Sequence, residues 1–443
     1  MAYEEFVGKA IEFHKQGDYA RAVDMYNRVM NREPTNNSLR FLMADAFLRM
    51  EWNGLAANLL KLQVQDEPEN DQAICNLGVA YRKENYYEPA KKCWERCITL
   101  KGDSVEVCSN MAGLYADSGH PKEAMEWLDR ALKIDPENVE ANWQRSLALL
   151  TMGDFDEGWK AYGWRTKLGN YDNRPNIKVP MWDGLQVRHL YIHGEQGVGD
   201  EIMFLSCVDE AIKSAMHVTL EVNRKVAALA RLTWPHIDVV TDETPGDYSA
   251  KIPIGSLAGM YRRRIGDFPG KAYLKPDPRR VEFYRSRLEE FGKPPYVAVA
   301  WVGGIKQTRV VDRSMSLSTL KPILEKYSCV SAQYNDRNPA IDVDAANNGL
   351  KKIDEASAGG DLAEQAALFK AVDAVVTVQQ TAVHVAGAVG TPCFALIAHN
   401  PQWRYLQTGP RMPWYDSVTL FRKPEDGEWP VGQVMKALDR EFS

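Results

Sequence analysis

The sequence predicts a helical repeat array followed by an α/β region that consists of two sheet-containing halves. Three observations lead to this fold class. Small residues recur at a fixed spacing in the first third of the chain, short apolar runs alternate with helical patterns after residue 184, and residues 373–403 have the pattern strand, turn, helix, strand. Strands that alternate with helices are typical of parallel sheets. The 443 residues are enough for two or three domains.

The first third of the chain carries three ladders of residues, each with a spacing of 34 positions. The ladders are Ala10, Ala44, Gly78 and Ala112; Ala22, Ala56, Ala90 and Ala124; and Pro34, Pro68, Gly102 and Pro136. This period is that of tetratricopeptide repeats. The small residues are expected where the two helices of a repeat cross closely, and each proline where the second helix stops.

A fifth repeat begins at Val139, with Gly153, Phe155 and Tyr162 at the expected places, so we predict a repeat domain over residues 1–166. We expect the last repeat to pack on the α/β region. The concave face of such an array suits an extended peptide, and a dimerisation or scaffolding surface is the alternative.

Composition excludes several classes of function. The net charge of −6 argues against a nucleic-acid-binding protein, which usually has a basic surplus. Seven cysteines without a paired spacing predict reduced thiols in the cytoplasm, and no histidine completes a zinc pattern around Cys75, Cys93, Cys97 and Cys108. No apolar stretch approaches the roughly 18 residues of a membrane span, and the first residues lack a signal-peptide pattern. We therefore expect a cytoplasmic protein without a structural metal.

The segment 167–275 is predicted to form the first half of the α/β region. It begins with a connector rich in Asn, Pro and Gly over Lys167–Gly184. The expected elements after it are a strand at 188–193, a glycine-rich turn at 194–200, a helix at 201–214 and strands at 217–222, 237–240 and 251–254. The turn, GEQGVGD, has neither the Gly-Lys-Ser/Thr of a P-loop nor the spacing of a dinucleotide-binding loop.

The segment 276–443 is predicted to form the second half. The expected elements are a helix at 276–292 that crosses between halves, strands at 296–301 and 329–334, a helix at 361–371, strands at 374–378 and 393–397, and a final strand and helix at 418–422 and 431–442. Thr381 is a good N-cap for a helix at 382–389, which Gly390 ends. That helix begins at the carboxyl end of a strand, where α/β sheets bind ligands, and its free N–H groups suit a phosphate.

Several residues of this segment carry a family resemblance. Thr381, His384, Ala386, Ala388, Gly390 and Pro392, followed by Pro401 and Trp403 in HNPQWRY (399–405), resemble the donor-sugar half of the heptosyltransferase-like glycosyltransferases. The chain is similar above all to bacterial proteins that join tetratricopeptide repeats to such a domain. Gln379 departs from the pattern, because the family usually has an acidic residue there. The resemblance implies a GT-B arrangement of two Rossmann-like halves, with residues 167–275 on the acceptor side and 276–443 on the nucleotide-sugar side. In such folds the last helix often crosses back to the first half.

The resemblance also implies roles for single residues. Asp200, after Gly199, matches the proposed catalytic base of the family. The alternative is that Asp200 only caps the following helix, with Glu195 and His193 as fallback bases. Lys306, and after it Arg313, are the candidates for contact with the diphosphate. His384 either donates to a phosphate or is a packing histidine. The complete set of candidate donor-binding residues is Gly197, Gly199, Trp301, Lys306, Arg313, Gln333, Gln380, Thr381, Ala382 and His384.

The function predicted from these observations is inverting transfer of a sugar from a nucleotide sugar to a hydroxyl or amide acceptor. The repeats favour a protein or peptide acceptor. The mechanism requires no metal and no cofactor beyond the donor substrate, and no Asp-x-Asp pair follows a predicted strand. Two alternatives stay open. In one, the enzyme acts on a glycan or lipid and the repeats only dock a partner; in the other, the chain is a non-catalytic adaptor, which Gln379 favours.

Overall fold

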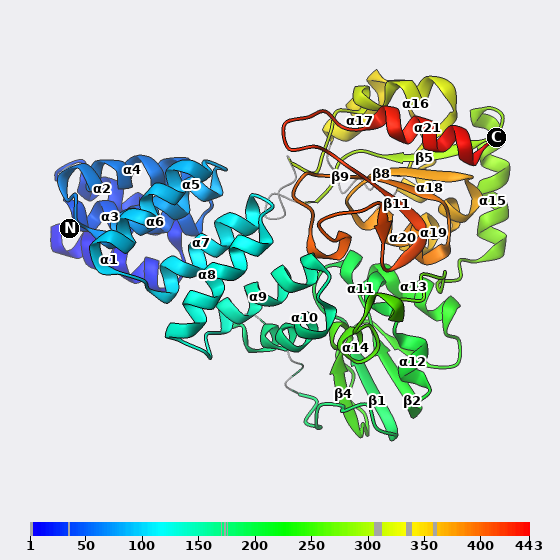
Figure 1. The fold of residues 1–443 in the computed structure, drawn as a ribbon, viewed down its shortest axis with the longest axis horizontal. Coiled ribbons are helices and arrows are strands. Elements are labelled where there is room, and N and C mark those ends of the chain that lie inside the picture. The colour runs from blue at the N-terminus through cyan, green and yellow to red at the C-terminus, as the bar shows by residue number, and fades with distance from the viewer. Residues whose placement is uncertain are drawn as a thin grey trace. The chain divides into compact units, whose positions relative to one another are not determined.

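The computed structural model describes residues 3–33, 36–169, 171, 174, 176–304, 312–333, 339–357 and 361–443 of the chain. Pro34 and Lys306 lie outside the described residues. The chain divides into two compact units, Met1–Ala148 and Leu149–Ser443, which are described separately (Figure 1). The predicted boundaries after residues 166 and 275 stay predictions.

The first unit consists of paired helices, drawn in blue and cyan in Figure 1. They are α1 (Tyr3–Lys15), α2 (Tyr19–Met30), α3 (Asn37–Arg49), α4 (Asn53–Asp66), α5 (Asp71–Lys83), α6 (Tyr87–Lys101), α7 (Val105–Asp117) and α8 (Pro121–Ile134), and α9 (Val139–Met152) runs through the boundary to the second unit. The alanines of the two alanine ladders are at most 1% exposed. The predicted close crossing of helices at these positions is confirmed.

Gly78 shows why the ladder needs small residues. A Cβ atom at this position would lie 2.7 Å from Cε2 of Trp94, which is fully buried. The indole of Trp94 in turn donates from Nε1 to the carbonyl of Cys75 over 3.2 Å. Large and small side chains therefore alternate across the α5–α6 crossing.

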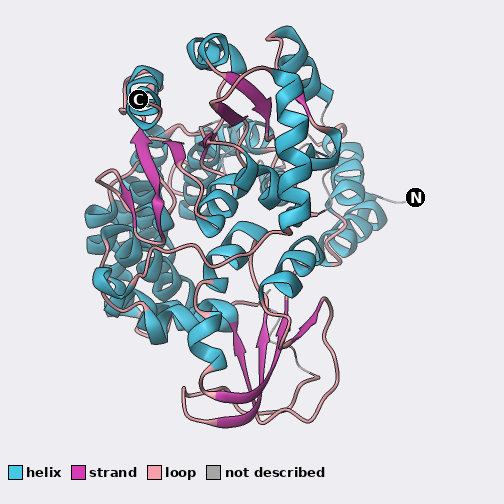
Figure 2. Cartoon of the chain, turned by 90° about the vertical axis from the view of Figure 1, so that its right-hand side faces the viewer, coloured by secondary structure: helices cyan, strands magenta, loops and turns pink. Residues whose placement is uncertain are grey.

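The second unit contains two sheets (Figure 2). The smaller sheet has four parallel strands in the order β3-β2-β1-β4. Its strands are β1 (Val187–His193), β2 (Ala215–Glu221), β3 (Asp238–Val240) and β4 (Ala250–Pro253). The helices of this lobe are α11 (Val198–Leu205), α12 (Val208–Ile212), α13 (Arg224–Thr233) and α14 (Ile254–Tyr261). The prediction of one helix at 201–214 is wrong, because the helix is interrupted at Ser206–Cys207, between α11 and α12.

The larger sheet has seven strands in the order β10-β11-β9-β8-β5-β6-β7, and all pairs except β10–β11 are parallel. Its strands are β5 (Tyr296–Ala300), β6 (Ser328–Ser331), β7 (Lys351–Lys352), β8 (Ala374–Val378), β9 (Cys393–Ile397), β10 (Arg411–Met412) and β11 (Tyr415–Arg422). The helices of this lobe are α15 (Pro278–Leu288), α16 (Lys321–Lys326), α17 (Pro339–Asn347), α18 (Asp354–Ser357), α19 (Leu362–Ala371), α20 (Thr381–Val389) and α21 (Val431–Glu441). The predicted strands β8 and β9 are confirmed to the residue.

The last helix differs from the expectation. Val431, Val434 and Leu438 of α21 pack in the apolar core of the larger sheet, and Asp439 bonds to Lys326 at 2.5 Å. The expectation that the last helix crosses back to the first half is therefore wrong. The amphipathic stripe of α21 is buried against its own lobe instead.

Short helical turns and one further helix complete the second unit. They are α10 (Phe155–Tyr162) and the 3₁₀ turns at Gly163–Lys167, Ile265–Asp267, Glu289–Phe291, Leu317–Leu320 and Trp403–Tyr405. Helix α10 packs on α14 of the smaller sheet's lobe, where Trp159 donates from Nε1 to the carbonyl of Arg262 at 2.8 Å. The expectation that the fifth repeat packs on the α/β region is confirmed for its second helix.

Candidate functional site

The amino ends of α11 and α20 meet between the two sheets of the second unit (Figure 1). A Cβ atom at Gly199 would lie 3.2 Å from Cδ2 of His384 and 3.5 Å from Oγ1 of Thr381. Only a residue without a side chain allows this approach without a shift. The two segments that the sequence singled out are therefore adjacent in the fold, although Gly199 and Thr381 are 182 positions apart.

The glycine-rich turn is shorter than predicted. Helix α11 already begins at Val198, so Gly199 and Asp200 lie in its first turn. The turn itself spans residues 194–197, and Gln196 takes the left-handed conformation there, with φ 64°. The Nε2 of Gln196 donates to the hydroxyl of Tyr162 at 2.5 Å, which fixes the turn against α10.

Asp200 is paired with a residue of the other lobe. Arg404, in the 3₁₀ turn Trp403–Tyr405, donates from Nη2 to Oδ1 of Asp200. Both side chains are largely buried, with exposed fractions of 9% for Arg404 and 16% for Asp200. In this state the candidate base is neutralised by a guanidinium. Because the pair joins positions 204 apart in sequence, local sequence patterns do not indicate it, although Arg404 lies within the segment 399–405 that carries the resemblance.

The amino end of α20 has no side-chain cap. The N-cap residue is Gln380, and its side chain makes no capping bond but donates to Oγ1 of Thr377 at 3.2 Å. Thr381 is the first helical residue, so its predicted role as N-cap is wrong by one position. Within the described part of the chain, the N–H groups of Thr381 and Ala382 have no hydrogen-bond partner. Free N–H groups at a helix start are a site for an anion.

His384 is a packing histidine. Its Nδ1 lies 3.3 Å from the hydroxyl of Tyr415 and its Nε2 lies 3.4 Å from the hydroxyl of Tyr405. Burial, and after it the nearby guanidinium groups of Arg404 and Arg313, lower the pKa of His384 well below its usual value. The ring is therefore neutral, and both its nitrogens face tyrosines rather than an open site.

Arg313 is brought to the same region. Its Nη2 and Nε donate to the carbonyl of Gln379 over 2.7 and 3.2 Å. The side chain of Gln379 is fully buried, and both of its amide atoms lack a partner among the described residues. A buried primary amide without a partner costs stability, which makes Gln379 a candidate ligand-binding group. The other candidate cation, Lys306, lies outside the described residues.

Trp301 and Gln333 have structural contacts. Trp301 is fully buried in the core of the larger sheet, and its Nε1 donates to Oδ2 of Asp344 at 2.8 Å. The Oε1 of Gln333 accepts from the N–H groups of Trp301 and Val302, both at 2.9 Å. This amide therefore holds the end of β5.

Glu195, the alternative candidate base, also forms a buried ion pair. Its carboxylate accepts from Nε of Arg165 at 2.9 Å and from Nη2 at 2.5 Å, and Oε1 also accepts from the N–H of Gly255 at 2.9 Å. Both side chains of the pair are at most 4% exposed. A carboxylate with these partners anchors the turn at 194–197.

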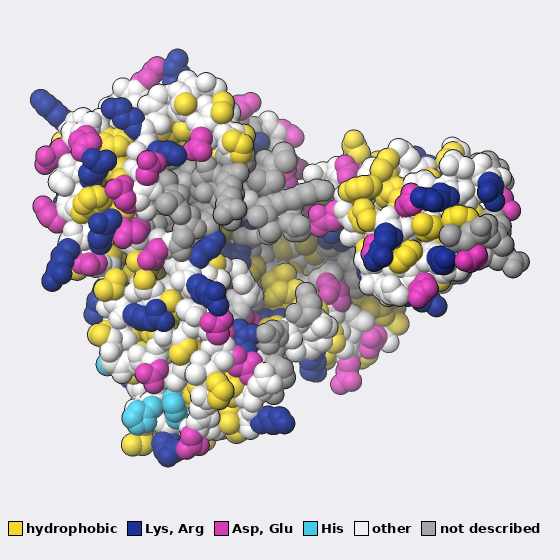
Figure 3. Space-filling model, turned by 180° about the vertical axis from the view of Figure 1, so that it is seen from behind, with side chains coloured by type: hydrophobic (Ala, Val, Ile, Leu, Met, Phe, Trp, Pro, Cys, Tyr) yellow, Lys and Arg dark blue, Asp and Glu magenta, His cyan; other side chains and the backbone are white. Residues whose placement is uncertain are grey.

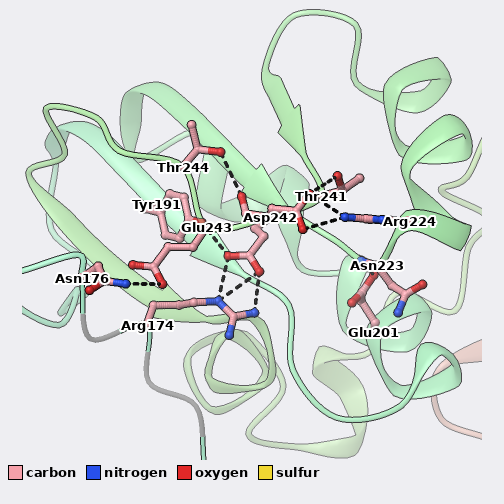
Figure 4. Close-up of polar contacts among 11 residues, drawn as sticks. Arg174, Asn176, Tyr191, Glu201, Asn223, Arg224, Thr241, Asp242, Glu243 and Thr244 are labelled. Atoms are coloured by element: carbon pink, nitrogen blue, oxygen red, sulfur yellow. Dashed lines mark hydrogen bonds and ion pairs between the residues drawn. The ribbon is translucent and has the colours of Figure 1, made fainter.

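A second polar cluster occupies the carboxyl ends of β1 and β2. Arg174 donates to both carboxylate oxygens of Glu221, and the hydroxyl of Tyr191 donates to the same carboxylate at 2.5 Å. Figure 4 shows Arg174 beside Tyr191, with Glu201 and Asn223 farther along the sheet edge. The cluster closes this end of the smaller sheet with paired charges.

His193, the last residue of β1, and Glu201 of α11 are both buried. The ring nitrogens of His193 have no partner among the described residues, and burial lowers its pKa to about 4. Glu201 accepts from the N–H of Asn223 at 2.8 Å, and burial raises its pKa to about 7. His193, the other fallback base, is thus enclosed in the interior.

Aromatic side chains join α10, both lobes and the candidate site. Trp159 contacts Trp403 at a ring-centroid distance of 5.6 Å, and Phe204 of α11 stacks on Trp403 at 6.3 Å. Trp414 packs on Phe204 at 5.8 Å. These contacts hold the Trp403–Tyr405 turn, and with it Arg404, in a fixed position against α11.

The described residues contain no group of three or more His, Cys, Asp or Glu side chains arranged for a metal ion. In the same part of the chain, no helix combines the length and the apolar character that a membrane span needs. On the face shown in Figure 3, basic and acidic side chains are interspersed over the described surface of the second unit.

Comparison with known proteins identifies the first unit. Residues 71–104 and 105–138 match the sequence profile of the tetratricopeptide repeat. The chain contains tetratricopeptide repeats. The predicted period of 34 residues agrees with the length of both matches.

Among curated proteins, the chain is 26% identical to Protein FlbA of Caulobacter vibrioides in a gapped alignment of 504 positions, which spans 98% of this chain and 83% of that protein. It is 29% identical over 105 residues to Protein O-mannosyl-transferase Tmtc3 of Drosophila melanogaster, a match of 22% of this chain and 11% of that protein. A similar match links it to Protein O-mannosyl-transferase TMTC1 of Mus musculus, with 24% identity over 28% of this chain and 13% of that protein.

Two solved structures with partial similarity to the chain are the MamA protein and TTC0263. The MamA protein covers 37% of this chain with a TM-score of 0.33 and 19% identity, and 90% of MamA is matched. TTC0263 of Thermus thermophilus, a thermophilic tetratricopeptide-repeat protein, covers 39% of this chain with a TM-score of 0.34 and 19% identity, and 93% of it is matched.

Proposed function

We propose that this chain is an inverting glycosyltransferase with a GT-B arrangement, in which the two sheets of the second unit are the two Rossmann-like halves. The observation that carries the proposal is the contact between Gly199 and Thr381. Asp200, the candidate base, follows Gly199 in the first turn of α11, and Thr381 begins α20, whose amino end is the candidate diphosphate site. Base and leaving group must lie on opposite sides of one sugar carbon, so this adjacency is what the reaction needs.

The chemistry follows from these groups. Asp200 accepts the proton of the acceptor hydroxyl or amide while the acceptor atom bonds to the sugar carbon. The bond between that carbon and the diphosphate breaks, and the electron pair leaves with the nucleoside diphosphate. The N–H groups of Thr381 and Ala382, together with Arg313 and Lys306, would stabilise the negative charge that develops on the leaving group.

The repeats supply the proposed acceptor specificity, because such arrays bind proteins and extended peptides. The partial similarity to two proteins named as O-mannosyl-transferases agrees with a link between repeats and protein glycosylation. The experiment is incubation of the full chain with labelled nucleotide sugars and cell lysate. Labelling of a protein band that is lost when residues 1–148 are deleted supports a protein acceptor. Retained labelling of glycan or lipid would favour the glycan-directed alternative.

One observation favours the adaptor alternative. The pairing of Asp200 with Arg404 removes the free base from the site. If this pair is permanent, the chain binds without catalysing. Hydrolysis of a nucleotide sugar by the purified chain excludes that alternative, and complete inertness toward UDP-, GDP-, ADP- and CMP-sugars would contradict the enzyme.

A further inference from the structure

The guanidinium of Arg404 contacts Asp200, Gln402 and the ring of Trp403. Nη2 donates to Asp200, Nη1 donates to Oε1 of Gln402 at 2.5 Å, and the group lies 5.1 Å from the ring of Trp403. Its Nε–H is buried and has no partner among the described residues. A buried charged donor without an acceptor is costly. The unpaired Nε–H therefore favours a further acceptor at this guanidinium.

Arg404 is linked to the start of α20 through Asp200 and Gly199. Asp200 follows Gly199, and Gly199 lies against Thr381 at the start of α20. The charge of Arg404 also acts on His384, in the first turn of the same helix. The N–H groups of Thr381 and Ala382, which have no partner in the described chain, thus lie in the same small region as the guanidinium. Together they favour an anion with several oxygens.

We propose that the ion pair between Arg404 and Asp200 acts as a lock: it keeps Asp200 from serving as a base until the donor diphosphate binds the guanidinium. This inference rests on the proposed glycosyltransferase function and adds its regulation. Without donor, the guanidinium holds the Asp200 carboxylate and the base is not available. When a diphosphate binds at the start of α20, its oxygens compete for the guanidinium, and Asp200 is released to accept the acceptor proton.

The lock has a functional consequence. Asp200 and the diphosphate compete for one cation, so donor binding and base release are the same event. The acceptor proton then passes to Asp200 only when a leaving group is in place. Proton transfer therefore depends on bound donor, and the guanidinium ends beside the diphosphate where negative charge develops as the sugar–oxygen bond breaks.

The test is a double-mutant cycle on ligand affinity, measured by calorimetry with the full chain. The probes are UDP, GDP, ADP and inorganic pyrophosphate. Asp200→Asn removes the competing carboxylate, so we expect the best-bound probe to bind roughly tenfold tighter. Arg404→Gln should weaken binding by roughly tenfold or more. In the Arg404→Gln background, Asp200→Asn should leave the affinity unchanged, because the shared guanidinium is gone.

The cycle separates the lock from simpler explanations. Plain repulsion between Asp200 and phosphate predicts the same gain from Asp200→Asn in both backgrounds, and that result overturns the lock. Unchanged affinity in the Asp200→Asn chain overturns it as well. If none of the probes binds the wild-type chain, the glycosyltransferase proposal fails and the lock fails with it, whereas binding without coupling refutes the lock alone.

Two controls keep the result interpretable. Arg404→Lys keeps the charge but loses the forked geometry, so it should restore part of the affinity that Arg404→Gln loses. This partial rescue distinguishes a ligand-binding role from a purely structural one if Arg404→Gln folds poorly. Arg263→Gln breaks an exposed ion pair with Asp156 in the same unit and should not change affinity.

Discussion

Gly199 of α11 lies against His384 of α20, with only 3.2 Å between the place of a Cβ and the imidazole Cδ2. This contact is where the smaller sheet's lobe touches the helix that follows β8. His384 cannot move freely, because the hydroxyls of Tyr415 and Tyr405 hold both ring nitrogens. The spacing between the two lobes at the candidate site is thus set by a glycine on one side and an immobilised histidine on the other.

The first prediction concerns this glycine. Gly199→Ala gains helix propensity worth about 0.5–1 kcal/mol but forces the two helices apart. We expect no net gain in the free energy of unfolding and a clear loss of nucleotide affinity. The matched control is Gly432→Ala, also at the second position of a helix, with open space around the added methyl group. Calorimetric binding and urea unfolding of both variants give the comparison, and equal behaviour of the two would contradict the contact's role.

The second prediction concerns the base. We expect Asp200→Asn to lose about 10²–10⁴ in turnover while the chain stays folded, because the acceptor proton then has no carboxylate to go to. Turnover of a nucleotide sugar is the measurement, with circular dichroism as the check on folding. Asp242→Asn, which breaks an exposed pair with Arg224, is the control. A variant at position 200 with near-normal turnover would remove Asp200 from the mechanism.

The third prediction concerns the amide of Gln379. Both its polar atoms are buried without a described partner. Gln379→Met keeps the length of the side chain and removes the unpaired polar atoms, so it should raise the free energy of unfolding by about 1–3 kcal/mol. If the amide binds the donor, nucleotide affinity should fall at the same time. Urea unfolding and calorimetry test both parts, and a less stable chain would show that the amide is satisfied in solution.

The fourth prediction concerns pH. His193 has its pKa lowered to about 4, so the unfolded chain binds more protons and the stability should rise by about 3 kcal/mol between pH 4 and 6.5. Glu201 has its pKa raised to about 7, so the folded chain binds more protons and the stability should fall by about 3 kcal/mol between pH 4.5 and 7. The two effects oppose each other in the wild-type chain.

Single variants should reveal each slope. In His193→Phe only the Glu201 effect remains, so the free energy of unfolding should fall as the pH rises. In Glu201→Gln only the His193 effect remains, so the free energy of unfolding should rise with pH. Both are read from urea unfolding at a series of pH values. Parallel pH curves for wild type and both variants would mean that water reaches the two side chains.

A fifth prediction follows from Lys306. We propose that it contacts the donor diphosphate, so Lys306→Ala should weaken nucleotide binding by calorimetry. Its matched control is Lys321→Ala, which loses only an exposed pair with Glu325. Unchanged affinity in the Lys306 variant would transfer the role to Arg313.

Local patterns in the sequence predicted local structure well. The short apolar runs at 374–378 and 393–397 correctly predicted two strands to the residue, and Gly390 takes the left-handed conformation expected after a helix, with φ 76°. The alanine ladders are buried as the repeat period requires. These features depend on residues close in sequence, or on a repeat whose geometry is the same in each copy.

The features of the candidate site that the sequence did not predict are contacts between residues far apart in the chain. Trp301 precedes a glycine-containing turn in sequence, yet the core of its own sheet encloses it. The pairing of Arg404 with Asp200 and of Arg165 with Glu195 depends on how distant segments pack. Composition and spacing do not indicate which acidic side chain pairs with which basic one. The sequence therefore identifies the candidate charged residues, and only the fold shows their ion-pair partners.

The measurement that tests the central claim most directly is a structure of the full chain with the best-bound nucleoside diphosphate. The account predicts the diphosphate at the N–H groups of Thr381 and Ala382, with the guanidinium of Arg404 turned from Asp200 to a phosphate oxygen. A nucleotide bound elsewhere, or side chains of the protein itself covering the start of α20, would contradict it.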